Sequence, residues 1–97
     1  MIRIMTADEP AAVTVTVDGH LSGEGVEPVR ACCADALLSG KPVRLYLRDV
    51  AAIDDRGRSM LRRLAAEGVD LRANGLYSSY VIEEIQSASV SKGRASL

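Results

Sequence analysis

Apolar residues recur along the chain with two different periods. In "VTVTVDG", residues 13–19, Val13, Val15 and Val17 alternate with polar residues. This period of two is typical of a strand with one buried face. The segment "PVRLYLRDV", residues 42–50, repeats the alternation and predicts a second strand. Both strands should therefore turn one face to the core and the other to solvent.

The spacing between these strands changes to that of a helix. From Val26 the apolar residues recur every three or four positions, and Ser39 and Gly40 mark the expected end of that helix. Its predicted buried stripe consists of Val26, Val29, Cys33, Ala36 and Leu37. A second helix should begin near Asp54 or Asp55, because either carboxylate can accept hydrogen bonds from free amides at a helix start.

The C-terminal part predicts one more strand and one more helix. "GVDLRANG", residues 68–75, reads as a strand of about five residues bounded by glycines. Ser78 is the expected N-cap of the last helix, with Tyr77 and Ile82 forming a hydrophobic staple across it.

The order of these elements predicts the fold class. "IRIM", residues 2–5, reads as a short strand paired with the first alternating strand through a turn. Strands then alternate with helices, so we expect a small single α/β domain with a mostly parallel or mixed four-stranded sheet and about three helices. We expect that domain to span residues 1–86. The Ser-rich segment 87–97 has no apolar period and predicts a flexible C-terminal tail.

Composition narrows the possible functions. The 97 residues suit one domain, and the absence of Phe and Trp leaves no aromatic platform for stacking bases. A formal net charge of −1 argues against attraction of the whole molecule to nucleic acid or membranes. No apolar run reaches signal-peptide or membrane-spanning length, and the two cysteines are adjacent. These features predict a cytoplasmic protein without direct membrane insertion.

The second predicted helix separates an apolar side from a positively charged one. At 100° per residue, its buried stripe consists of Gly57, Met60, Leu61, Leu64 and Ala65. The opposite side and the helix start carry Arg56, Arg58, Ser59, Arg62 and Arg63. Such a patch suits a carboxylate, a phosphate or an acidic partner surface. The alternative is an ordinary solvated face.

Several segments together resemble a known family. "VTVTVDGHLSG", "VRLYLRDVAAID", "IDDRGRSMLRRL" and "GVDLRANGLYSSYVIEEI" occur in the order found in STAS domains, the fold of bacterial anti-sigma-factor antagonists. The resemblance covers residues 13–85. It implies a regulatory protein-interaction module that is not an enzyme and needs no cofactor. It also implies a protein partner, either a serine kinase that acts as an anti-sigma factor or, in accessory-subunit members, a transporter ATPase.

The resemblance assigns positions around the second helix. Asp54 matches the family Asp, Gly57 the family Gly, and Arg56 stands where phosphorylated members carry Ser or Thr. Arginine has no hydroxyl group, so the usual phosphorylation switch is predicted to be absent. Tyr46 also replaces an Asp often found in the preceding strand. Ser59 is a displaced candidate acceptor, with an ordinary exposed serine as the alternative.

We therefore predict a non-catalytic interaction module of unknown oligomeric state. Its hypothetical partner-binding residues are Asp54, Asp55, Arg56, Arg58, Ser59, Arg62 and Arg63. The alternative function is an accessory subunit of a lipid-transport ATPase or a small-ligand-binding STAS domain.

Other candidate chemistry has simpler structural interpretations. The sequence contains no second ligand or nucleophile in register with its only histidine, His20, which argues against a metal site or a catalytic triad. Cys33 is expected to pack as a small apolar residue. The glycines of "DGHLSGEG" lack the spacing of a phosphate-binding loop.

Overall fold

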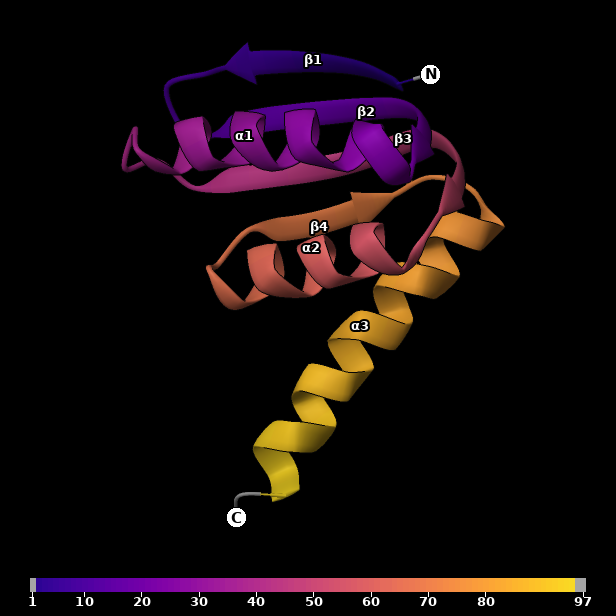
Figure 1. The fold of residues 1–97 in the computed structure, drawn as a ribbon. Coiled ribbons are helices and arrows are strands. Elements are labelled where there is room, and N and C mark those ends of the chain that lie inside the picture. The colour runs from indigo at the N-terminus through magenta and orange to yellow at the C-terminus, as the bar shows by residue number, and fades with distance from the viewer. Residues whose placement is uncertain (1, 96–97) are drawn as a thin grey trace.

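A four-stranded mixed sheet forms one layer of the molecule and three helices form the other (Figure 1). This computed structural model describes the backbone of residues 2–95 and the side chains of residues 2–86. In chain order the elements are β1 (Ile2–Asp8), β2 (Val13–Leu21), the short 3-10 helix η1 (Gly23–Gly25), α1 (Val26–Leu37), β3 (Val43–Ile53), α2 (Asp55–Ala66), β4 (Asp70–Ala73) and α3 (Leu76–Ala95).

The predicted strand at the start of the chain is confirmed and is longer than expected. β1 pairs antiparallel with β2, from Ile2 opposite Gly19 to Asp8 opposite Val13. A tight turn joins the two strands, in which the Glu9 amide donates to the Ala12 carbonyl at 2.9 Å. β2, β3 and β4 then run parallel in that order, because a helix returns the chain between each pair.

The end of β3 does not follow the simple alternation that predicted the strand. Val43, Leu45 and Leu47 are buried at a spacing of two, but the next buried residues, Val50 and Ile53, follow at a spacing of three. The register with β2 shifts twice in this region, after Val17 and after Gly19. Each shift inserts an extra residue into β3 and turns the following side chain back to the core. The strand therefore continues to Ile53 instead of ending near Val50.

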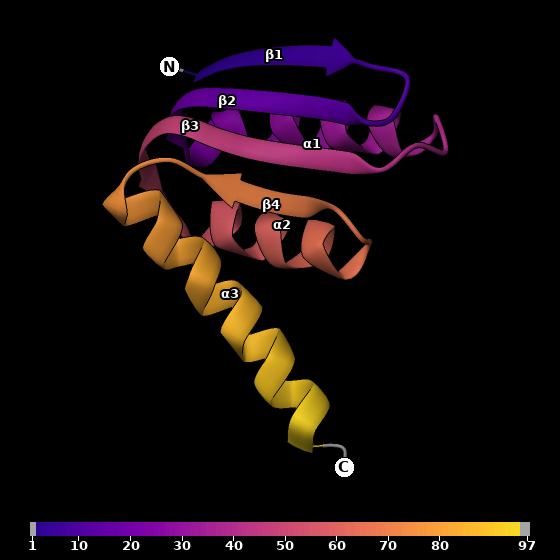
Figure 2. The same cartoon turned by 180° about the vertical axis from the view of Figure 1, so that it is seen from behind.

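The core lies between one face of the sheet and the helices. Figures 1 and 2 show α1 and α2 on the same face, while no helix of the described residues lies on the opposite face. The predicted stripe of α2 is confirmed: Gly57, Met60, Leu61 and Leu64 are buried and Ala65 is partly buried. The predicted stripe of α1 is also confirmed, since Val29, Cys33 and Ala36 are buried and Val26 and Leu37 pack against the core.

The start of the last helix differs from the prediction. α3 begins at Leu76, so Ser78 lies inside the helix and is not its N-cap, and Tyr77 does not precede the cap as a staple would require. The buried Ser78 hydroxyl donates to the Val50 carbonyl at 3.0 Å. The Tyr77 hydroxyl donates to the Ile53 carbonyl and accepts from the Ile53 amide, both at 3.2 Å. These two side chains fasten α3 to the irregular end of β3.

The backbone of α3 is helical as far as Ala95. This helical backbone does not test whether the segment is flexible, and residues 96 and 97 lie outside the described residues. A period of apolar residues indicates burial rather than helicity, so its end does not mark the end of the helix. The division into a domain of residues 1–86 and a flexible segment 87–97 stays a prediction.

Candidate functional site

Asp54 holds the start of α2 against the preceding loop. It is the N-cap of α2, and its Oδ1 accepts from the Gly57 amide at 2.8 Å. Its other oxygen, Oδ2, accepts from the Gly23 amide at 2.9 Å. These two hydrogen bonds, first that from Gly23 and then that from Gly57, hold the pKa of the Asp54 carboxyl below its ordinary value. Both carboxylate oxygens are engaged, so Asp54 has a structural role.

The lowered pKa predicts a pH-dependent contribution to stability. A carboxylate with a depressed pKa stabilises the fold fully above its unfolded pKa, about 3.9, and loses that contribution as pH falls through the folded value. In Asp54→Asn the carboxamide can accept from only one of the two amides. We expect wild type to exceed this variant in unfolding free energy at pH 7, and the difference to shrink as pH falls below about 4. Urea denaturation at several pH values tests this, and a difference independent of pH would contradict it.

Gly57 lets α2 lie directly on the end of β2. A Cβ atom at this position would be 2.4 Å from the Leu21 carbonyl oxygen and 2.9 Å from the Ile53 Cγ2. The same Leu21 carbonyl accepts from the Asp54 amide at 3.3 Å. The Asp and Gly of the motif therefore fix the position of the helix start by two independent contacts.

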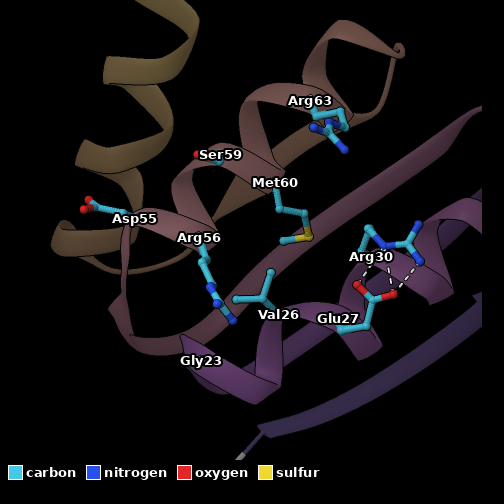
Figure 3. Close-up of a pocket in the computed structure, with 9 residues that line it drawn as sticks. All are labelled: Gly23, Val26, Glu27, Arg30, Asp55, Arg56, Ser59, Met60 and Arg63. Atoms are coloured by element: carbon cyan, nitrogen blue, oxygen red, sulfur yellow. Dashed lines mark hydrogen bonds and ion pairs between the residues drawn. The ribbon is translucent and has the colours of Figure 1, made fainter.

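A groove of about 390 Å³ lies between α1 and α2, next to this helix start. Figure 3 shows the nine side chains and backbone positions around it. They are Gly23, Val26, Glu27, Arg30, Asp55, Arg56, Ser59, Met60 and Arg63. Val26 from α1 and Met60 from α2 supply apolar surface, and the α2 wall adds Arg56, Ser59 and Arg63. The groove thus combines an apolar strip with guanidinium and hydroxyl groups.

The charges around the groove are not all balanced. On α1, the Arg30 guanidinium donates to Glu27 at 2.5 Å, which lowers the pKa of Glu27 and raises that of Arg30. Among the described side chains, Arg56 and Arg63 form no ion pair. Figure 3 shows Arg56 extending toward Gly23 and Val26, whereas Asp55 points away from α1. The α2 wall therefore presents two unpaired cations.

The structure does not group the four arginines of α2 into one patch. Arg58 turns toward α3, where its guanidinium donates to Glu84 Oε1 at 3.1 Å, and only 26% of its side chain is exposed. Arg62 is exposed outside the groove, while Arg56 and Arg63 line it. Arg58 therefore lies apart from the two groove arginines, and the role of the predicted set in partner binding stays a prediction. Ser59 is exposed in the groove, and Asp55 is exposed at the helix start.

The α1 wall was missed by reasoning from the sequence. Val26, Glu27 and Arg30 lie on a helix that is adjacent to α2 only because the sheet is parallel and both crossovers pass over one face. A signal was present, since Glu27 and Arg30 are three residues apart on a helix and such pairs face each other. That spacing predicts an ion pair within α1, but it does not predict that α1 lies beside α2.

The remaining candidate chemistry does not form a reactive site among the described residues. Desolvation, with a smaller effect from Cys32, raises the pKa of Cys33 to about 12, so this thiol is held in its neutral form. The described residues include no group of three or more potential metal ligands. His20 is exposed near the end of β2. No helix in the described part of the chain is long and apolar enough to cross a membrane.

Comparison with solved structures identifies the fold. The chain superposes on an anti-sigma factor antagonist from Mycobacterium paratuberculosis with a TM-score of 0.75 and 15% identity, over 96% of this chain and 82% of that one. The unphosphorylated form of the anti-sigma factor antagonist SpoIIAA matches with a TM-score of 0.52 and 16% identity, over 89% of this chain and 98% of that one. The predicted fold class is confirmed: this is a small α/β domain with the anti-sigma factor antagonist fold.

A further structural similarity involves a protein called Mglu. It matches with a TM-score of 0.58 and 28% identity over 75% of this chain, which corresponds to only 19% of that chain. No protein-family model and no curated protein matches the sequence.

Proposed function

We propose that this chain is a non-catalytic regulatory module that binds an acidic surface of a partner protein in the α1–α2 groove. The observation that carries the proposal is the pair of unpaired arginines, Arg56 and Arg63, beside the apolar strip of Val26 and Met60. An amphipathic acidic segment would pair its carboxylates with these guanidiniums and cover the apolar strip. The likeness to anti-sigma factor antagonists supports a regulatory role.

The partner class follows from that likeness. We propose a protein of the kind that anti-sigma factor antagonists oppose, an anti-sigma factor, including those that are serine kinases. Arg56 occupies the position that the resemblance assigns to the phosphorylated residue, and a guanidinium cannot accept a phosphoryl group. The module therefore binds without the usual switch, and its surface carries a permanent positive charge instead of one that phosphorylation makes negative. A cytoplasmic location is part of this proposal.

The roles within the predicted partner-binding set differ. Arg56, Ser59 and Arg63 contact the partner in the groove, with Asp55 at its margin and Arg62 outside it. Asp54 acts indirectly by holding the helix start, and Arg58 is held by Glu84. Charge reversal at Arg62 should accordingly affect binding less than reversal at Arg56 or Arg63.

Site-specific crosslinking tests where the partner binds. A photo-crosslinking residue, p-benzoylphenylalanine, replaces Ser59 in the groove in one variant and Leu38 in a control. Leu38 is 86% exposed and follows the far end of α1. We expect irradiation in the native cell to give a covalent adduct with a discrete protein at position 59 and none at position 38. Equal adducts at both positions, or an adduct at 38 alone, would contradict binding in the groove.

A further inference from the structure

The outer edge of β1 is a free strand edge. The sheet order places β1 at one side, paired only with β2. Figure 2 shows no other segment of the described chain beyond it. Half of the backbone amides and carbonyls of a strand point to each side, so those on the outer side of β1 have no strand partner among the described residues. Such an edge is a template for another strand.

β1 lacks the devices by which proteins usually protect a sheet edge. Its seven residues, Ile2–Asp8, include no proline, and its register with β2 contains no bulge. Its two charged residues, Arg3 and Asp8, lie toward the ends and not in the centre. The opposite edge strand differs, because β4 has only four residues and α3 packs against it. Short strands, bulges, prolines and central charges discourage pairing, and β1 has none of them.

The apolar side chains of β1 also indicate that another strand packs beside its outer edge. Met5, at the centre of the strand, is 40% exposed on the face of the sheet without helices. Ile2 and Ile4 are only partly buried although they face the helix layer. A neighbouring strand would remove these apolar side chains from water as well as satisfy the backbone.

We propose that β1 pairs with β1 of a second copy of this chain, in antiparallel orientation, to form a continuous eight-stranded sheet. The interface is isologous, with its two-fold axis perpendicular to the sheet. Pairing of all seven residues requires Met5 to lie opposite Met5 of the second copy. Arg3 then lies opposite Ala7, and no like charges face each other. Centring the axis on Arg3 instead would oppose two guanidiniums and shorten the pairing.

Because the proposed two-fold axis passes through the Met5 pair, opposite charges introduced at Met5 test the interface. A strand edge is a small interface, so wild-type protein should dimerise reversibly, and its mass by sedimentation equilibrium should rise with concentration toward twice 10.3 kDa. Met5→Lys and Met5→Glu each place like charges together at the axis, so each alone should stay monomeric. Their equimolar mixture should regain the dimer, because the two side chains then attract.

Leu38→Lys is the control, since it adds the same charge at another exposed position and should dimerise like wild type. Circular dichroism checks that each variant is folded before its mass is compared. A wild type that stays monomeric at every concentration, a Met5→Lys variant that dimerises like wild type, or a mixture that stays monomeric would each overturn the proposal. These outcomes are independent of partner binding in the α1–α2 groove.

Discussion

Gly57→Ala should destabilise this domain more than any other single methyl addition in α2. The new Cβ would lie 2.4 Å from the Leu21 carbonyl oxygen, which belongs to the backbone of β2 and cannot rotate away. Either the helix or the strand end must shift, and the hydrogen bond from the Asp54 amide to the same carbonyl would be lost. We expect a loss of about 3 kcal/mol in unfolding free energy, the upper end of the range for overpacked sites.

Urea denaturation measures this loss as a fall in the transition midpoint on the order of 1 M or more. Ser59→Ala is the matched control, because it lies two residues further along the same helix with an exposed side chain, and it should change stability by less than about 0.5 kcal/mol. A Gly57→Ala variant as stable as this control would show that the close approach of α2 to β2 does not exist.

The elements predicted correctly from the sequence depend on local signals. The stripe of α2 and its capping aspartate follow from residues within one or two helical turns of one another, and so does the alternation of β2. These predictions agree with the structure because the apolar face that the local spacing defines is the face that the fold buries.

The elements predicted incorrectly depend on contacts between distant residues. Ser78 has the residue type of an N-cap, but its hydroxyl donates to Val50, 28 positions earlier. The last residues of β3 pair with β2 through two register shifts. The alternation of apolar residues within β3 cannot predict these shifts, because they depend on the partner strand. The groove likewise needs both α1 and α2, and Arg58 is separated from Arg56 and Arg63 by an ion pair with Glu84 on a third helix.

Arg56 and Ser59 both lie on the groove side of α2, close to its start. Asp54 and Gly57 fix the position of the start of α2. Arg56 lies between them and carries a permanent positive charge. We propose that this domain has kept the shape of the partner-binding helix and exchanged a switchable charge for a permanent one.

Reversal of both groove arginines, Arg56→Glu with Arg63→Glu, should weaken partner binding by roughly tenfold to a hundredfold. Each change replaces an attraction to the acidic partner with a repulsion. Like charges that face each other across a desolvated interface cost up to several kcal/mol. Arg56 and Arg63 are both exposed to solvent, so the lower part of that range applies. The fold should persist, because neither side chain forms an ion pair among the described residues.

Arg44→Glu with Arg72→Glu is the matched control for this variant. Both arginines lie on the sheet face without helices, where they pair with Asp70 at 3.3 and 3.1 Å, and their reversal changes the net charge by the same amount. Loss of binding in the groove variant alone would therefore show that the location of the reversed charges, and not the net charge of the protein, determines binding.

Quantitative affinity capture from the native cell lysate, with wild type, the groove variant and the sheet-face control side by side, tests binding in the α1–α2 groove most directly. Binding in the groove predicts a discrete protein that is retained by wild type and by the Arg44→Glu, Arg72→Glu control, and lost from the Arg56→Glu, Arg63→Glu variant. Retention of the same protein by all three, at equal yield, would contradict it.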